Sequence, residues 1–242
     1  SLEKQGYKIK GSTTRPEKLS ELRHAGIEPL WLQLTPEPKG IGWDYLLDCD
    51  VLIVNIPPRL EKAGTAFHPT QIRHLVNLIK SSSIQQVIYI SSTSVYPDLN
   101  REVKEEDITD PDQSASPALV EVEQLIQNLP QFTLILRCGG LMGYERIPAK
   151  YVAGKKELTT GELPVNYIHR DDVIGVIRAF LQTPDLWNTT YNVVAPLHPT
   201  RQEVYLTSCL PFGYDPPTFK EGESKSFKII SSQKLQNALG YR

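Results

Sequence analysis

Runs of mainly apolar residues, each about as long as a β-strand, recur through the first half of the chain. They are rich in Val, Ile and Leu and lie at residues 7–9, 27–34, 51–56, 87–90 and 132–136. Stretches with the apolar spacing of an amphipathic helix lie between them, at residues 16–24, 67–81 and 117–128. Mainly apolar strands that alternate with such helices predict an α/β fold, with a doubly wound parallel sheet covered by helices on both faces.

The pattern changes after residue 137. The remaining chain has longer loops with many Gly and Pro residues, a helical pattern at 171–181, and a short one at 232–239. Residues 211–217 carry three prolines and a glycine, which predict a turn-rich surface segment. We therefore expect a dinucleotide-binding part at 1–137, followed at 138–242 by a small, mixed C-terminal substrate lobe with segments that return to the core.

The chain opens as if inside a βαβ unit. Residues 1–10 have the pattern of a helix end, a stop at Gly6 and then a strand. In a dinucleotide fold, a first strand and a Gly-x-Gly-x-x-Gly turn that holds the pyrophosphate would precede this point. The sequence contains no such triplet. We expect truncation before Ser1, with natural loss as the alternative.

Charge and composition narrow the classes of partner. The net charge is -2 and no run of Lys or Arg occurs, so neither a nucleic acid nor a membrane surface is expected as a partner. The three cysteines, at 49, 138 and 209, have no zinc or redox spacing, and the five histidines are scattered, so no metal site is predicted. The apolar runs are too short to span a membrane. We expect a cytoplasmic protein with a small-molecule substrate, and a homodimer among its oligomeric forms.

The end of the first apolar run carries the first candidate ligand residues. In a dinucleotide fold, this position faces the adenosine ribose, where an acid selects NAD and an Arg accommodates the 2′-phosphate of NADP. Here the chain reads Ser12, Thr13, Thr14 and Arg15, without an acid. These donors match a dianionic phosphate, so NADP is favoured over NAD. The alternative is a turn whose hydroxyls cap the helix that begins at Pro16.

A second candidate segment follows the apolar run at 51–56. Asn55, Ile56 and Pro57 precede another proline, which forces the chain to bend. We expect these three residues to line the ribose and pyrophosphate side of the cofactor. An ordinary strand-terminating loop is the alternative.

Four consecutive hydroxyl residues, 91–94, end the run at 87–90, and the chain continues Val95-Tyr96-Pro97. This segment resembles the Ser-Ser-x-x-Val-Tyr-Gly strand end of the extended short-chain dehydrogenase/reductases, the NAD-dependent epimerase/dehydratase family. The resemblance implies a Rossmann-like fold, with Ser91 at the cofactor and Ser92 as the group that polarises the substrate. Thr93 and Ser94 would contact the substrate, in the places where dehydratases have an acid pair. The alternative is that the hydroxyls only turn the chain by bonding local backbone.

Two later segments extend the resemblance. Residues 136–143 are similar to the family's Arg-x-Gly-x-x-Tyr-Gly-Pro passage, which implies that Cys138 and Gly139 border the nicotinamide and that Met142 and Tyr144 face the substrate. Residues 166–173 are similar to its Ile-His-Val-x-Asp segment. His169 is there either a substrate contact or a hydrogen-bonded structural group.

The acids that follow, Asp171 and Asp172, are expected to cap the next helix.

One difference from the family leaves two hypotheses for the function. The family transfers a proton with a Tyr-x-x-x-Lys pair, and the matching positions here are Ala115 and Leu119. One hypothesis is an atypical NADP-dependent oxidoreductase or epimerase-like enzyme, acting on a small carbonyl or sugar-nucleotide substrate through Ser92. The other is a catalytically inactive nucleotide-sensing or assembly protein on the same fold. Whether the chain is an enzyme therefore stays open at this point.

Overall fold

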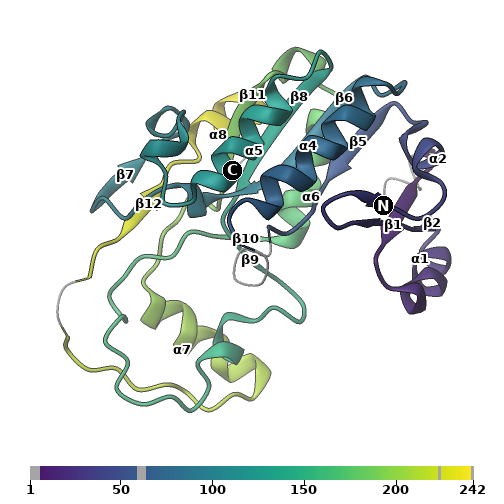
Figure 1. The fold of residues 1–242 in the computed structure, drawn as a ribbon. Coiled ribbons are helices and arrows are strands. Elements are labelled where there is room, and N and C mark those ends of the chain that lie inside the picture. Colours follow the sequence, from purple (N-terminus) through teal and green to yellow (C-terminus); the bar gives the residue numbers. More distant parts are fainter. Residues whose placement is uncertain (1–5, 59–63, 223–224, 241–242) are drawn as a thin grey trace. The chain divides into compact units, whose positions relative to one another are not determined.

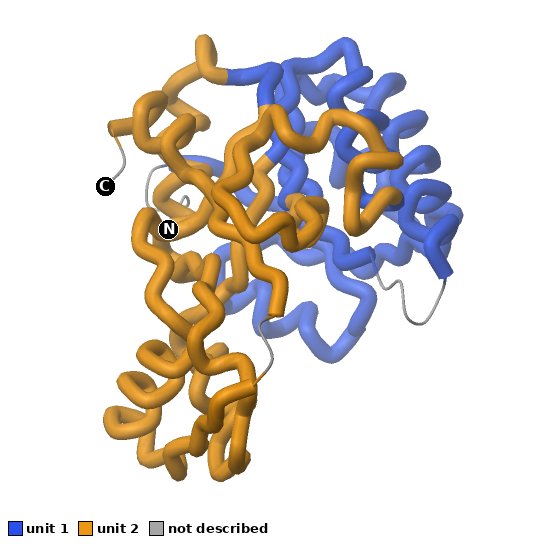
Figure 2. The backbone as a smooth tube through the Cα atoms, turned by 90° about the vertical axis from the view of Figure 1, so that its left-hand side faces the viewer, with its two compact units in different colours: residues 1–90, 118–135, 187–189 blue, residues 91–117, 136–186, 190–242 orange. Residues whose placement is uncertain are grey.

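The computed structural model describes residues 6–58, 64–222 and 225–240. The chain forms two compact units whose segments interleave along the sequence, coloured separately in Figure 2. Unit 1 comprises Ser1–Ile90, Ala118–Ile135 and Trp187–Thr189, and unit 2 comprises Ser91–Pro117, Leu136–Leu186 and Thr190–Arg242. The division expected after residue 137 stays a prediction.

A four-stranded sheet carries the alternation of strands and helices that the sequence predicts. Its strands are β5 (Val51–Val54), β6 (Gln86–Ser92), β8 (Phe132–Cys138) and β11 (Thr189–Val193), in the spatial order β11-β8-β6-β5. Figure 1 shows α4 (Phe67–Lys80) and α5 (Pro117–Gln127) on one face of this sheet. β5 and β6 are parallel, with Val51 opposite Gln86, so a crossover must connect them. The doubly wound α/β fold class is confirmed.

The core of unit 1 is mainly apolar and includes a buried polar cluster around His68. Ile72 of α4 and Val122 of α5 are fully buried in it. His68 is also fully buried, with Nε2 3.0 Å from the Tyr89 hydroxyl and Nδ1 3.0 Å from Oε1 of Gln71. Burial lowers the pKa of His68, since the charged imidazolium would lose its hydration. The neutral histidine is thus part of the packing of α4.

The N-terminal part of unit 1 departs from the expected single sheet. The strand expected at 7–9 lies instead at β1 (Lys10–Thr13), and it pairs in parallel with β2 (Glu28–Trp31). The run at 27–34 is divided into β2 and β3 (Gln33–Leu34), because β3 turns into an antiparallel hairpin with β4 (Pro38–Lys39). Among the described residues, no strand pairs with both β1 and β5.

The helices of unit 1 near β1 are short. The helix expected at 16–24 forms as a 3-10 turn, η2 (Pro16–Lys18), followed by α1 (Leu19–His24). Helix α2 (Trp43–Leu47) was not expected, because five residues are too few to show a helical period.

Within its described residues, unit 2 holds two short parallel strand pairs and three α-helices. β7 (Arg101–Val103) pairs with β12 (Lys228–Ile230), and β9 (Gly140–Met142) pairs with β10 (Tyr167–His169). The expected helices at 171–181 and 232–239 are confirmed as α6 (Arg170–Phe180) and α8 (Gln233–Leu239). The expected turn-rich segment at 211–217 is confirmed from Gly213 onward, but α7 (Arg201–Phe212) continues through Pro211 and is capped by Gly213, whose φ of 68° suits a helix cap.

Candidate functional site

The end of β1 presents three exposed polar side chains of the predicted ribose site. The Oγ1 of Thr13 accepts a hydrogen bond from the Arg15 amide at 3.2 Å and donates to the Arg15 carbonyl oxygen at 3.4 Å, which shapes the turn into η2. Ser12, Thr14 and Arg15 are exposed. The turn-forming alternative therefore holds for Thr13, while the other three side chains remain available to a ligand.

The residues after β5 also lie in unit 1. Asn55 and Pro57 are exposed, and Ile56 is partly buried against the apolar core. They follow β5 of the four-stranded sheet, whereas Arg15 follows β1 of the two-stranded sheet. Their predicted contacts with a cofactor stay a prediction.

The hydroxyl residues at the end of β6 differ in exposure. Ser91 and Thr93 are buried, whereas Ser94 is exposed and Ser92 is intermediate. Oγ of Ser92 accepts a hydrogen bond from the Ser94 amide at 3.1 Å and so caps the 3-10 turn η3 (Thr93–Val95). The chain-turning alternative is thus correct for the acceptor side of Ser92. A hydroxyl that accepts one bond still carries a hydrogen that it can donate.

A buried polar network holds this strand end, and the sequence did not predict it. The Tyr96 hydroxyl donates to Oδ1 of Asn192 at 2.7 Å and accepts from Nη1 of Arg137 at 2.9 Å. Arg137 also donates to the carbonyl oxygens of Glu105 at 3.1 Å and Ile108 at 2.9 Å. Burial raises the pKa of Tyr96 to about 12, so this tyrosine is a structural group and a poor proton donor. The sequence feature that could have indicated this network is Arg137, a charged residue inside the otherwise mainly apolar strand β8.

The two residues expected beside the nicotinamide are buried at the end of β8. Burial raises the pKa of the Cys138 thiol to about 12, which keeps it protonated. The Gly139 amide donates to the Val193 carbonyl oxygen at 3.0 Å, and a Cβ at this glycine would clash with the Asn166 carbonyl oxygen. Close backbone packing therefore explains this glycine, and its predicted role at a cofactor stays untested.

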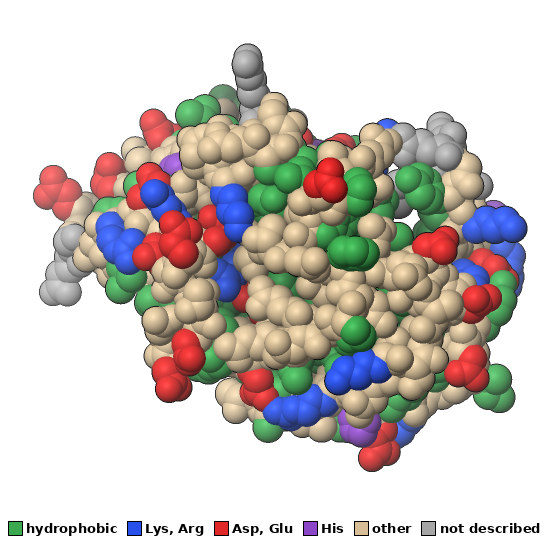
Figure 3. Space-filling model, turned by 90° about the horizontal axis from the view of Figure 1, so that it is seen from above, with side chains coloured by type: hydrophobic (Ala, Val, Ile, Leu, Met, Phe, Trp, Pro, Cys, Tyr) green, Lys and Arg blue, Asp and Glu red, His purple; other side chains and the backbone are tan. Residues whose placement is uncertain are grey.

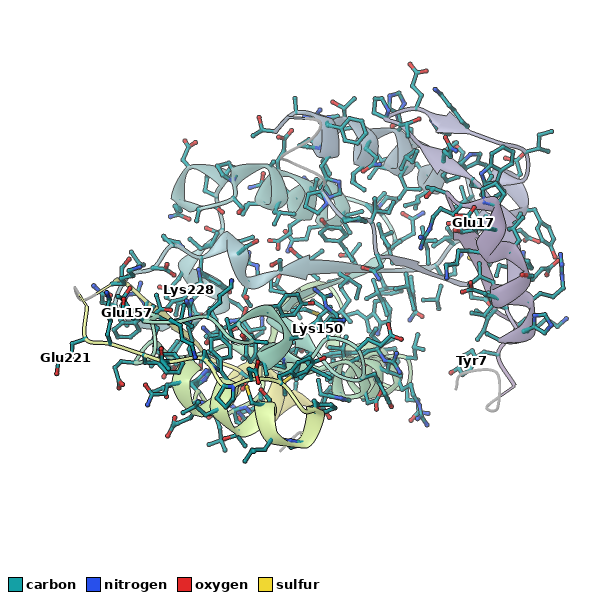
Figure 4. All side chains as sticks on the ribbon, turned by 90° about the horizontal axis from the view of Figure 1, so that it is seen from below. Tyr7, Glu17, Lys150, Glu157, Glu221 and Lys228 are labelled. Atoms are coloured by element: carbon teal, nitrogen blue, oxygen red, sulfur yellow. The ribbon has the colours of Figure 1, made fainter. Side chains whose placement is uncertain are left out.

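Unit 2 contains a pocket of about 520 Å³ that brings together three of the predicted substrate residues, Met142, Tyr144 and His169. Its other walls are the turn at 143–146, the start of η6 (Pro148–Tyr151) and one side of α7. η6 packs against α7, and Figure 4 labels Lys150 of η6 in this region. The volume lies in the range of small-molecule sites.

The polar edge of the pocket is a connected cluster. Tyr144 donates its hydroxyl to Oδ2 of Asp171 at 2.7 Å, and the guanidinium carbon of Arg170 lies 4.1 Å from the centre of the Tyr144 ring. Nδ1 of His169 accepts from the Asp171 amide at 3.2 Å and thereby caps α6. With Nδ1 accepting, we assign the hydrogen of the neutral ring to Nε2. The ring centres of Tyr144 and His169 are 5.7 Å apart.

This cluster corrects the expected helix cap. Asp171 and Asp172 lie in the first turn of α6, where negative charge is favourable, but His169 is the capping residue. The prediction that His169 is a hydrogen-bonded structural group is therefore confirmed for Nδ1. The opposite edge of the ring faces Gly143, and a Cβ added to this glycine would lie 2.6 Å from Nε2.

The tyrosines near this region are poorly suited to release a proton. The hydrogen bond to Asp171 raises the pKa of Tyr144 and lowers that of Asp171, since it stabilises the phenol and the carboxylate together. Burial, together with a hydrogen bond to Tyr205, raises the pKa of Tyr167. Neither can serve easily as a replacement for the missing catalytic tyrosine.

The sequence interpretation missed the residues that α7 and the turn contribute to the pocket. Arg146, Glu203 and Thr207 are among the pocket residues, and none was a candidate. Arg146 had a weak signal, because it follows Gly143 closely enough to close a tight turn. Glu203 and Thr207 have no sequence feature that distinguishes them from other helix residues, and only the packing of α7 brings them to the pocket.

Among the described residues, no group of three or more His, Cys, Asp or Glu side chains could hold a metal ion. No helix in the described part of the chain is long and apolar enough to cross a membrane. On the face shown in Figure 3, Lys and Arg side chains are interspersed with Asp and Glu.

Comparisons with known proteins place the chain among relatives. It is 35% identical over 245 residues to protein YeeZ of Escherichia coli strain K12, covering 100% of this chain and 89% of that protein. No family model matches. A functionally unknown conserved protein from Silicibacter pomeroyi DSS superposes with a TM-score of 0.72 at 23% identity, covering 100% of this chain and 86% of that one.

A solved enzyme has the same fold. UDP-glucuronic acid 4-epimerase from Bacillus cereus, in complex with UDP-glucuronic acid and NAD, superposes with a TM-score of 0.74 at 14% identity, covering 100% of this chain and 87% of that one. The resemblance to the extended short-chain dehydrogenase/reductases is thereby confirmed for the fold.

Proposed function

Since the chain belongs to the family of Escherichia coli protein YeeZ and has the Rossmann-type fold of NAD-dependent epimerases, we propose that it is an atypical NADP-dependent oxidoreductase or epimerase-like enzyme. Its substrate is a small carbonyl compound or a sugar nucleotide. The proposal rests mainly on the Ser92 hydroxyl at the end of β6. This hydroxyl accepts a hydrogen bond from the Ser94 amide and still has a hydrogen that it can donate.

The choice of cofactor rests on the donors at the end of β1. Arg15 is exposed, and within the described part of the chain its guanidinium has no ion-pair partner. Ser12 and Thr14 add exposed hydroxyls, and no carboxylate lies between residues 11 and 16. A 2′-phosphate needs donors and positive charge, whereas a ribose diol needs an acceptor, so this set fits NADP better than NAD. The complex of the Bacillus cereus epimerase supports a nicotinamide nucleotide in general.

In this proposal the chain's own residues orient the substrate. NADP, when bound, supplies hydride chemistry at its nicotinamide ring. Ser92 donates a hydrogen bond to the carbonyl oxygen of the substrate, which stabilises the negative charge that develops there. The hydroxyls of Tyr96 and Tyr144 are already donated to Asn192 and Asp171, so the proton comes from water or another group.

Nucleotide binding is the first test. We expect the full-length protein to bind NADPH more tightly than NADH, and Arg15→Ala to weaken NADPH binding roughly 10-fold or more, since charge-assisted hydrogen bonds contribute about 1.5–3 kcal/mol. Arg23→Ala removes an exposed cation from α1 and is the matched control. Equal affinities for the two nucleotides, or an unchanged Arg15→Ala variant, would refute the choice of NADP.

Turnover on a panel of carbonyl compounds is the second test. Ser92→Ala should lower kcat with little change in NADPH affinity, because the hydroxyl acts on the reacting oxygen. Ser20→Ala, at an exposed serine of α1, is the control. A Ser92→Ala variant as active as the parent protein would contradict the proposed role.

A nucleotide-sensing protein is the second candidate function. The observation in its favour is that Ala115 and the buried Leu119 occupy the positions of the family's proton-transferring pair. Tight NADPH binding without turnover on any compound of the panel would favour this function over the enzyme.

A further inference from the structure

Among the described residues that line the pocket of unit 2, Arg146 is the one Lys or Arg, and it lies in a fixed turn. Gly143 and Arg146 pair through two backbone hydrogen bonds, of 3.2 Å from the Gly143 amide and 2.7 Å from the Arg146 amide. Tyr144, inside this turn, has a φ of 44° and is held by Asp171. The backbone that carries Arg146 is thereby fixed at the pocket edge, while its guanidinium is exposed.

Several polar side chains of the pocket already form hydrogen bonds with the backbone of α7 or of its N-cap residue. Glu203 accepts from the Thr200 amide at 2.7 Å in a capping box, which holds its pKa below the usual value. Ser208 donates to the carbonyl oxygen of Val204 at 2.6 Å. The polar groups left for a ligand are the guanidinium of Arg146, the Thr207 hydroxyl and Nε2 of His169.

The remaining walls are mainly apolar. They include Met142, Ile147, Pro148, Pro199, Val204 and Phe212. Phe212 is 53% exposed, so much of its surface is open to solvent at the pocket. A ligand with an apolar body would cover this ring and gain the free energy of removing both surfaces from water.

The charges of the pocket disfavour a sugar nucleotide. A nucleoside diphosphate sugar brings at least two negative charges and many hydroxyls, each of which needs a partner when it leaves water. The residues that line the pocket include one arginine, Arg146, one histidine, His169, and one carboxylate, Glu203, so the site has little excess positive charge. One anionic group can be paired with Arg146, whereas a second would lie near Glu203 without a cation.

We propose that this pocket binds a carbonyl compound with an apolar body and one carboxylate, which pairs with Arg146. The proposal rests on the proposed function and narrows its substrate from a small carbonyl or sugar nucleotide to an apolar 2-oxo acid or a similar monoanion. The carboxylate can form a bidentate pair with the guanidinium, while the apolar body lies against Phe212 and the prolines.

Binding of three probes to the full-length protein, measured by calorimetry without nucleotide, tests the proposal. The probes are phenylpyruvate, its methyl ester and UDP-glucose. We expect phenylpyruvate to bind at least 10-fold more tightly than either of the others. The ester lacks the carboxylate that pairs with Arg146, and UDP-glucose has a second negative charge for which the pocket has no cation. Arg146→Gln should weaken phenylpyruvate binding 10-fold or more, and Phe212→Ala should weaken it several-fold. Arg178→Gln, at an exposed arginine of α6, should change it less than 2-fold.

The outcomes separate this proposal from the function on which it rests. Tighter binding of UDP-glucose, no binding of phenylpyruvate at millimolar concentration, or an Arg146→Gln variant that binds like the parent would overturn the substrate class. NADPH binding, measured on the same Arg146→Gln protein, should be unchanged. A parent protein that binds phenylpyruvate but neither NADPH nor NADH would instead refute the nicotinamide function and leave the pocket assignment intact.

Discussion

Replacing Arg137 by leucine should destabilise unit 2 strongly, because this arginine is only 3% exposed and supports a buried network. The substitution removes the donors to the Tyr96 hydroxyl and to the carbonyl oxygens of Glu105 and Ile108. Each buried acceptor left without a donor costs about 1–3 kcal/mol. Since leucine recovers part of this through apolar packing, we expect a loss of about 3–5 kcal/mol, a large part of the stability of a typical domain.

Urea denaturation followed by far-UV circular dichroism measures this loss. With a slope of about 3 kcal/mol per molar urea, the midpoint should fall by roughly 1–1.7 M. Trp31, Trp43 and Trp187 all belong to unit 1, so their fluorescence reports the other unit in the same samples. Arg178→Leu, at an exposed site, should shift the midpoint little. An Arg137→Leu midpoint close to that of the parent protein would show that the network contributes little, and the reasoning from buried acceptors would be wrong.

Unit 1 should lose stability as the pH falls below 6.5, the ordinary pKa of histidine. Burial lowers the pKa of His68 in the folded protein, so below this pH the unfolded chain binds more protons than the folded one. Urea denaturation followed by tryptophan fluorescence at several pH values measures this loss, and a stability that does not change with pH would contradict the prediction. Gly143→Ala should weaken phenylpyruvate binding more than Gly154→Ala does, because both have positive φ but only the first places a Cβ against His169. Thr200→Ala should cost about 1 kcal/mol by removing the cap of α7, with an unchanged urea midpoint as the contrary result.

The order of the main strands and helices can be predicted from the amino-acid sequence alone. The helix expected at 67–81 is α4 (Phe67–Lys80), and the strand expected at 87–90 lies inside β6 (Gln86–Ser92). Both are long enough for burial to impose a regular apolar period, and such a period is readable without any tertiary contact. The placement of Ser92 at a strand end follows from the same pattern.

The tertiary structure alone decided the short strands and the composition of the pocket. Strands β7, β9, β10 and β12 have three residues each and form through backbone pairing with segments distant in the sequence, which leaves no side-chain period. His169 became the cap of α6 because the imidazole reaches the Asp171 amide, although the neighbouring acids suit the helix end equally well by type. Arg146 and Phe212 meet at one pocket only because α7 packs beside η6, and no local pattern along the chain records that contact.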